Sequence, residues 1–410
     1  MRSPILAALL ALSPAARAEP EGPHAREAAL HAQDPEPEWV PAPPAQRTQL
    51  AATRPPLFKR VYGYVPYWVS LDLAAFRWDL ISDVIAFSVE IATDGTVANL
   101  HSLPKAALVQ AARSNGAKVH LAATLFNTSG GGQIATFLGS SAATAKATQQ
   151  LASLAQGLDG INLDFEFVPS GSRDAFTAFV QQLHAALPAG SELTLAMPAS
   201  VGYTGYDVPK LAASIERLLL MEYDYHWRGS PTSGANSPLA AVETAVNGFL
   251  AAQAPAASIA MGVPYYGYDW PTATASPGSN TSAGGTTVLF RDVFGKFATY
   301  GRLWDPASQT PWYRYSAGAQ QRQGWVDDDQ SLALKFSLVN QKALAGVMVW
   351  ALGYDSGRPE AWDALRTAFG QDPPPPAARA HGCSQAGGTP AWLVLAAALA
   401  AGAARRRGAC

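Results

Sequence analysis

The stretch that most constrains the fold is 157–168, where polar and apolar side chains alternate. Successive side chains of a β-strand point to opposite faces, so Asn162, Asp164 and Glu166 share one face and large apolar residues share the other. Three polar groups in a row are costly to bury, so this face either meets solvent at a sheet edge or lines a polar cavity. The apolar opposite face and the preceding Asp-Gly turn favour a barrel strand with a chemically active end.

Seven further apolar runs of strand length accompany this stretch, and helix-like apolar spacing separates most of them. The predicted strands cover 61–67, 83–90, 117–126, 159–167, 192–198, 217–224, 258–265 and 345–352. The predicted helices cover 104–115, 144–156, 173–187, 207–215, 238–253 and 330–342. This alternation predicts an α/β fold, a (β/α)8 TIM barrel over 57–369. The long gap 267–343 predicts an extended loop or small insertion between strands seven and eight.

The N-terminal residues differ in composition from this barrel region. Residues 1–18 contain Arg2, an apolar run and an Ala-Arg-Ala cleavage site, which predict a signal peptide and secretion. Residues 19–56 are rich in Ala and Pro and predict a disordered linker.

The C-terminal residues predict a sorting or anchoring tail. A Pro-rich spacer at 370–390 precedes 391–410, which joins a short apolar helix to an Arg cluster. With the Gly-Cys-Ser at 382–384, this arrangement resembles the C-terminal sorting tails of myxobacterial surface proteins. The resemblance implies processing near Cys383, transient membrane association, and display at the cell surface or outer membrane of a Gram-negative cell. A plain membrane anchor is the alternative.

Composition excludes several other classes of function. The net charge of −2, with 15% charged residues, gives no nucleic-acid footprint. Both cysteines, Cys383 and Cys410, lie in the tail, so the barrel has no disulfide or cysteine metal site. No histidine pair has the spacing of metal ligands, so we expect no metal and no cofactor. We also expect a monomer.

Carboxylates and aromatic residues gather where the predicted strands end, which is where TIM barrels carry their chemistry. Aromatic faces stack on sugar rings, and glycosidic cleavage needs an acid to protonate the leaving oxygen. Glu166 is the candidate acid, with its pKa raised by the nearby charge of Asp164.

The segment from Asp159 to Glu166, Asp-Gly-Ile-Asn-Leu-Asp-Phe-Glu, resembles the DGxDxDxE signature of glycoside hydrolase family 18, the chitinase-like barrels. Met-x-Tyr-Asp at 221–224 and Gly-Val-Met-Val-Trp at 346–350 resemble the sixth and eighth strands of that family. Segments 64–68 and 262–267 resemble the branch that holds spore-germination and cortex-lytic peptidoglycan hydrolases.

The resemblance implies a retaining, substrate-assisted mechanism. Glu166 would protonate the glycosidic oxygen, Asp164 would orient the substrate's acetamido group, and Tyr223 would hydrogen-bond its carbonyl, while that carbonyl attacks the anomeric carbon. Further substrate-binding residues would be Asn162, Asp224, Trp350, Met221, Tyr64, Trp68 and Tyr266.

Two departures from the family pattern bear on the substrate. Asn162 stands where the signature has its middle Asp, and we expect its amide to donate a hydrogen bond to Asp164. The third strand lacks the Ser-x-Gly-Gly of many chitinases, which weakens the case for crystalline chitin. We therefore expect a hydrolase of polysaccharides or oligosaccharides that contain β-linked N-acetylglucosamine, from peptidoglycan or chitin. The alternatives are a non-catalytic, lectin-like surface protein and a wall-bound structural protein. The presence of Glu166, with Asp164 and Tyr223, argues for catalysis over the lectin-like alternative, and the structural alternative predicts glycan binding without turnover.

Overall fold

The computed structural model describes residues 22–37, 57–127 and 131–370. The predicted signal peptide and C-terminal tail lie outside these residues, as does the rest of the expected linker. Within the described part of the chain, no helix combines the length and the apolar character needed to cross a membrane.

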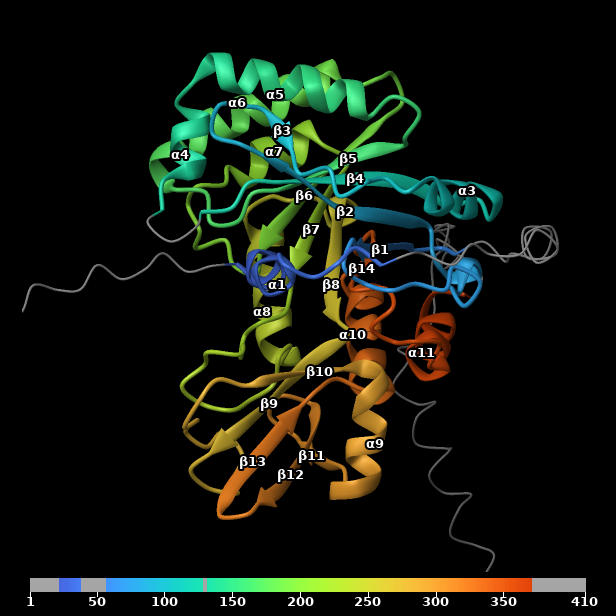
Figure 1. Ribbon diagram of the computed structural model, residues 1–410, viewed down its shortest axis with the longest axis vertical. Coiled ribbons are helices and arrows are strands. Elements are labelled where there is room, and N and C mark those ends of the chain that lie inside the picture. The colour runs from blue at the N-terminus through green and yellow to red at the C-terminus, as the bar shows by residue number, and fades with distance from the viewer. Residues whose placement is uncertain (1–21, 38–56, 128–130, 371–410) are drawn as a thin grey trace, which may run out of the picture. The chain divides into compact units, whose positions relative to one another are not determined.

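Eight parallel strands form a closed barrel at the centre of the molecule (Figure 1). They are β1 (Arg60–Pro66), β2 (Asp83–Ile91), β4 (Lys118–Thr124), β5 (Gly160–Asp164), β6 (Glu192–Pro198), β7 (Arg217–Met221), β8 (Ile259–Pro264) and β14 (Gly346–Trp350). β1 pairs with both β14 and β2, which closes the ring. The short β3 (Val97–Ala98) adds an antiparallel pair to β2. The predicted (β/α)8 barrel is confirmed.

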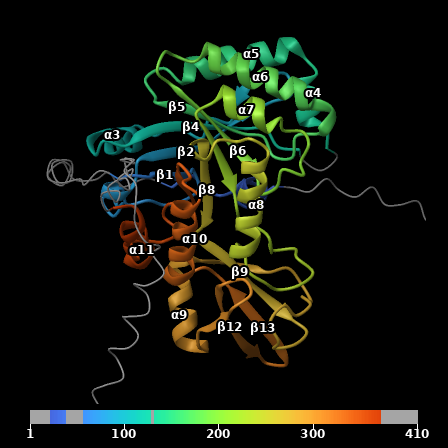
Figure 2. The same ribbon diagram turned by 180° about the vertical axis from the view of Figure 1, so that it is seen from behind.

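Helices cover the outside of the barrel, so its strands are buried on both faces and read as near-continuous apolar runs. The covering helices are α3 (Ala106–Ser114), α4 (Gln133–Leu138), α5 (Ser141–Leu154), α6 (Arg173–Ala186), α7 (Val208–Ser214), α8 (Leu239–Ala251), α10 (Asp329–Gln341) and α11 (Pro359–Phe369). Figure 2 shows α8 and α10 against the barrel from behind. Single turns of 3-10 helix occur at Trp78–Leu80, Ser170–Ser172 and Ala256–Ser258. Asp328 begins α10 with a capping box, in which its side chain and that of Ser331 each accept from the other's backbone N–H.

The chain between β8 and β14 forms a second sheet, drawn in orange at the bottom of Figure 1. It contains β9 (Tyr266–Thr272), β10 (Thr286–Leu289), α9 (Phe290–Tyr300), β11 (Leu303–Asp305), β12 (Thr310–Ala317) and β13 (Gln320–Trp325). The strands pair antiparallel in the order β10-β9-β13-β12-β11. Aromatic side chains hold this sheet together, and Trp312 and Trp325 stack at 5.1 Å between ring centroids.

A further helix, α1 (Pro23–His31), lies within the segment expected to be a disordered linker. For residues 23–31 the structure therefore has a helix where a disordered linker was expected. The sequence of α1 is rich in Ala, Arg, Glu and Leu, which favour helix, and Pro23 stands at the first or second helical position. An isolated helix this short is marginal in water, so its contacts with the barrel must hold it.

Candidate active site

The carboxyl end of β5 places two acids in the mouth of the barrel. Asp164 is the last residue of the strand and is fully buried. Glu166 lies in the turn that follows and is 2% exposed. The predicted strand 159–167 is therefore longer than β5, which ends at Asp164. Phe167, in the turn that follows, has a positive φ of 56°.

The end of β7 supplies the next polar groups. Met221 ends the strand, and Tyr223 and Asp224 follow it at the barrel mouth. Asp224 has a positive φ of 62°. Its Oδ1 accepts hydrogen bonds from the hydroxyls of Tyr266, at 2.6 Å, and Tyr268, at 3.2 Å. Tyr266 and Asp224 thus form a single hydrogen-bonded unit.

Trp350, the last residue of β14, forms an aromatic floor between these two acidic ends. Its side chain is fully buried. Tyr64, on β1, lies 5.2 Å from it between ring centroids, and Trp68 lies 6.4 Å away. The structure therefore brings the candidate residues of β1, β5, β7 and β14 to one end of the barrel.

Asn162 is placed inside the barrel, but its contacts differ from the expected ones. Its Oδ1 accepts a hydrogen bond from the Tyr64 hydroxyl at 2.7 Å, and its amide donates to Thr194 Oγ1 at 2.9 Å. The expected hydrogen bond to Asp164 is not formed, and Asp164 Oδ1 has no partner among the described residues. The two hydroxyls hold the amide away from the acid.

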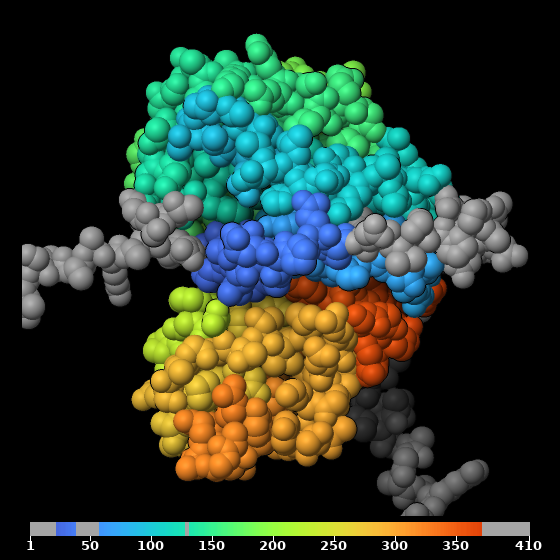
Figure 3. Space-filling model, viewed as in Figure 1, coloured from blue at the N-terminus to red at the C-terminus, as the bar shows by residue number. Residues whose placement is uncertain are grey.

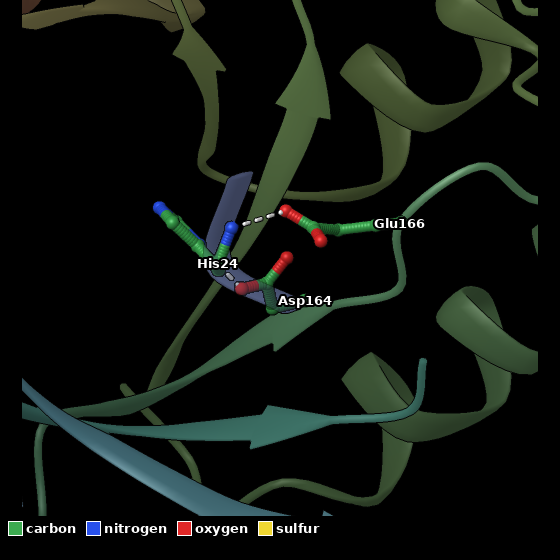
Figure 4. A group of neighbouring side chains, drawn as sticks. All are labelled: His24, Asp164 and Glu166. Atoms are coloured by element: carbon green, nitrogen blue, oxygen red, sulfur yellow. Dashed lines mark hydrogen bonds and ion pairs between the residues drawn. The ribbon is translucent and has the colours of Figure 1, made fainter. Parts of the chain in front are cut away.

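The centre of this site is filled by His24 of α1. The imidazole stacks on Trp350 with 3.8 Å between ring centroids and 19° between planes. Nδ1 lies 2.6 Å from Asp164 Oδ2, and Nε2 lies 2.6 Å from the Tyr223 hydroxyl. Figure 4 shows His24 beside both acids, with a dashed line to each of Asp164 and Glu166. His24 itself is fully buried.

Glu166 closes the N-terminal end of α1. Its two carboxylate oxygens accept hydrogen bonds from the backbone N–H groups of His24, at 3.0 Å, and Ala25, at 2.9 Å. The first N–H groups of a helix have no partner within the helix, and the helix dipole attracts negative charge there. The preceding residue, Gly22, touches the same acid: a Cβ at this position would lie 2.1 Å from Glu166 Oε2 and 2.8 Å from its Cβ.

Three other side chains of α1 meet the barrel mouth. Arg26 Nη2 lies 2.5 Å from Asp224 Oδ2, and its guanidinium lies 4.5 Å above the Trp227 ring. Glu27 accepts a hydrogen bond from the Tyr354 hydroxyl at 3.3 Å. His31 stacks on Trp68 at 4.9 Å between centroids, with 10° between planes.

Burial sets the protonation of this cluster. Burial, and next the charge of Asp164, raises the pKa of Glu166 to about 7. Burial also raises the pKa of Asp164 well above its usual range and lowers the pKa of His24 to about 4. With α1 in place, the carboxyl group of Glu166 therefore changes its protonation state near neutral pH.

Cavities flank α1 along the barrel mouth. One of about 660 Å³ includes Ala25, Ala28 and Tyr67 in its lining, and another of about 660 Å³ includes Glu27 and Trp68. A third, of about 320 Å³, is lined by residues that include Pro23, Arg26, Met221, Tyr223 and Asp224. The helix therefore lies along a groove and occupies its middle.

Two groups of side chains have the spacing of metal ligands. His24, Asp164 and Glu166 each place one ligand atom within 4.8 Å of the others, as do Asp83, His120 and Glu192. The atoms of the first group are already engaged in hydrogen bonds. The second group lies at the opposite end of the barrel, where arginine and lysine side chains neutralise its acids.

Residues 60–355 match the profile of Glycosyl hydrolases family 18. The chain belongs to this family. A Bacillus subtilis protein described as a sporulation-specific glycosylase is 32% identical over 216 residues, which cover 49% of each chain. Mouse chitotriosidase-1 is 33% identical over 233 residues, covering 49% of this chain and 50% of the mouse protein. The family 18 chain thus spans about half the length of these curated relatives.

The fold has the same affiliation. The crystal structure of the Bacillus cereus spore cortex-lytic enzyme SleL aligns with a TM-score of 0.66 and 22% identity, covering 76% of this chain and 74% of that one. Such a likeness supports the family 18 barrel fold.

Sequence reasoning missed His24 and the rest of α1. A signal was present: Gly22 and Pro23 precede a run of strong helix formers, an order typical of a helix start. Nothing local in the sequence indicates where such a helix docks.

Proposed function

We propose that this chain is a secreted, retaining glycoside hydrolase that cleaves β-linked N-acetylglucosamine-containing glycans by substrate-assisted catalysis. Glu166 would protonate the glycosidic oxygen. The acetamido oxygen of the sugar would attack the anomeric carbon, giving an oxazolinium intermediate that water opens with retention of configuration. Asp164 would orient and stabilise the acetamido nitrogen, and Tyr223 would donate a hydrogen bond to the oxygen.

The observation that carries this proposal is the position of the His24 ring. In an imidazole, as in an acetamido group, two polar atoms are separated by one carbon. The two ring nitrogens reach Asp164 and Tyr223, the same two groups that an acetamido N–H and C=O would need, and the ring lies flat on Trp350. The site therefore accepts a planar group with one polar atom toward the acid and one toward the tyrosine.

The remaining predicted contacts assign supporting roles. Trp350 would stack beneath the sugar, and Tyr64, Trp68 and Met221 would shape the walls around it. Asp224, held by Tyr266, would bind a sugar hydroxyl or the leaving-group side. Asn162 would act through Tyr64, because its side-chain oxygen accepts a hydrogen bond from the Tyr64 hydroxyl.

Peptidoglycan and soluble chitin oligomers are the proposed substrates. A spore cortex-lytic enzyme and a chitotriosidase among the family relatives support these two classes. The N-terminal signal and the C-terminal tail predicted from the sequence support secretion and display at the cell surface. The protein would act as a monomer.

The test is release of reducing ends from peptidoglycan and from N-acetylglucosamine oligomers, side by side. Because α1 lies in the site, the full-length protein is assayed together with Gly22→Ala, whose added methyl group would collide with Glu166. Glu166→Gln in each background is the control for contaminating activity. The product anomer, read by NMR within seconds of cleavage, should be β. Glycan binding without any release in either background would replace the hydrolase with a lectin.

A further inference from the structure

We propose that residues 22–31 form an autoinhibitory segment that fills the glycan-binding site and must leave before substrate can enter. This inference rests on the proposed function of the same site.

The first argument is competition for the same atoms. His24 uses Asp164 Oδ2, the Tyr223 hydroxyl and the face of Trp350 at once, and its ring is fully buried among them. These are the groups proposed to hold the acetamido-bearing sugar. A sugar and this imidazole cannot occupy the site together.

The second argument concerns the proposed acid. Both oxygens of Glu166 accept backbone N–H groups of α1, so neither faces a glycosidic oxygen. The approach is close because Gly22 has no side chain. Its φ of −75° and ψ of 172° suit any residue, so contact with Glu166, and not backbone strain, is what requires glycine here.

The third argument is the length of groove that the segment covers. Two helical turns beyond His24, the ring of His31 stacks on Trp68, and between them Arg26 pairs with Asp224. Figure 3 shows the dark-blue segment lying across the face between the cyan and green part and the orange part. Since cavities flank α1 within this groove, the helix occupies the path that a glycan chain would follow.

The fourth argument is that α1 can dissociate from the barrel without unfolding it. The segment adds no strand to the barrel sheet, and Leu30, in the last turn of the helix, is exposed. Docking buries Glu27 and partly buries Arg26. The desolvation of these two side chains offsets part of what the Arg26–Asp224 ion pair and the hydrogen bond from Tyr354 to Glu27 contribute. A short helix held by side-chain contacts is therefore displaced more readily than any barrel element.

The main test compares Gly22→Ala with Gly295→Ala in the full-length protein. Gly295 lies on α9, where an added Cβ meets no heavy atom within 4 Å, so it controls for the change from glycine to alanine. Hydrogen exchange of the amides in 23–31 reports docking, and kcat/KM on N-acetylglucosamine oligomers reports access. We expect Gly22→Ala to lose amide protection and to gain about tenfold or more in kcat/KM, because the competent fraction rises. Gly295→Ala should change neither.

Lost protection with unchanged kcat/KM would overturn autoinhibition and leave the proposed function standing. If both proteins are inactive, the proposed function fails, and calorimetry with N-acetylglucosamine oligomers then decides the inference separately. Tighter oligomer binding to Gly22→Ala would support competition by α1, and equal binding would overturn it.

A second variant is needed in case the docked helix accommodates the methyl group that Gly22→Ala adds. His24→Ala removes the ring from Trp350 and should also raise kcat/KM. A fall in kcat would overturn the inference, since it would make His24 part of the catalytic machinery. A synthetic peptide of residues 19–37, added to His24→Ala protein, should raise KM without changing kcat. The same peptide carrying His24→Ala is its matched control, and equal inhibition by both peptides would count against the proposal.

Discussion

The two ends of the barrel each bury a cluster of acids, but they treat the charges in opposite ways. At the amino end, Asp83 is the first residue of β2 and Glu192 is the first residue of β6. Arg60 forms ion pairs with both acids, and Lys118 forms a further ion pair with Glu192. At the carboxyl end, Asp164 and Glu166 hydrogen-bond to His24 and to backbone N–H groups of α1. The first cluster is paired with cations of the barrel itself, whereas the second is hydrogen-bonded to a segment that lies outside the barrel.

The pKa values follow this difference. Burial raises the pKa of Asp83, but hydrogen bonds from His120 and Arg60 outweigh it and hold the pKa well below the usual range. Against its own burial, Arg60 and Lys118 lower the pKa of Glu192. Burial raises the pKa of Glu166 to about 7. One end thus keeps fixed anions for stability, while the other keeps an acid whose proton can move.

Removing one acid from each end gives the largest contrast in activity. Glu166→Gln should lower kcat about 10³-fold in the Gly22→Ala background, because a general acid contributes of that order. Asp83→Asn in the same background should leave kcat per folded molecule unchanged. Steady-state release of reducing ends, normalised to folded protein by circular dichroism, measures both. Comparable losses in the two variants would erase the functional distinction between the ends.

The same pair of variants should reverse its order in stability. Asp83→Asn leaves Arg60 with one acid fewer in a buried network, which should cost about 3 kcal/mol of unfolding free energy at neutral pH. Glu166→Gln removes an acid that is costly to ionise and should not destabilise the fold at that pH. Urea unfolding with a common m-value gives both numbers. A larger cost for Glu166→Gln would contradict the assignment of the structural end.

The pH dependence of stability should have opposite signs at the two ends. Glu166 has a folded pKa of about 7 above its ordinary 4.5, so its favourable contribution is full below pH 4.5 and is lost as the pH rises through 7. Relative to Glu166→Gln, the parent should therefore lose on the order of 3 kcal/mol between pH 4.5 and 8. Asp83 has a lowered folded pKa, so its contribution is present above its ordinary 3.8 and is lost as the pH falls below that value.

Urea unfolding of the parent and both variants across this pH range checks these signs. The difference in unfolding free energy between the parent and Asp83→Asn should narrow as the pH falls below 3.8. Relative to Glu166→Gln, the unfolding free energy of the parent should fall as the pH rises from 4.5 to 8. Parallel curves for all three proteins would mean that neither acid titrates as its surroundings indicate.

The smallest effect is expected at the rim of the amino end. The side chain of Lys118 is 43% exposed, so its pairing with Glu192 is screened by solvent. Lys118→Ala should cost less than about 1 kcal/mol, and the cost should shrink at high salt. Urea unfolding at low and high ionic strength measures it, with Lys146→Ala, a surface pair to Asp94, as the matched control.

The sequence predicts the carboxyl end of the barrel better than it predicts the helix α1 that docks there. Period-two alternation around Asp164 and the apolar runs of the other strands are local patterns, and they lead to the barrel and to the face that carries the acids. The predicted strand runs past the end of β5 because the alternation continues through Phe165 and Glu166, although the backbone there already leaves the strand and turns. The hydrogen bond expected of Asn162 was wrong because Tyr64 and Thr194, from other strands, compete for its amide.

Helix α1 could not be predicted for a different physical reason. It lies in the Ala- and Pro-rich stretch 19–56, whose few aliphatic side chains are typical of chains that do not fold, and two helical turns carry little stability of their own. What stabilises it is a set of partners far along the chain, such as Asp164 for His24 and Asp224 for Arg26. Local sequence patterns do not encode contacts across more than a hundred residues.

The attachment of α1 to β1 through residues 38–56 has a consequence for when the protein would act. A tethered ligand experiences an effective concentration set by its linker, and this value does not fall when the protein is diluted. Dilution alone would therefore not activate the protein. Its apparent affinity for glycan would be reduced by a constant factor, the inverse of the open fraction. Soluble oligomers at low concentration would therefore leave α1 bound, whereas a dense polymer that presents many sugars to one groove would displace it.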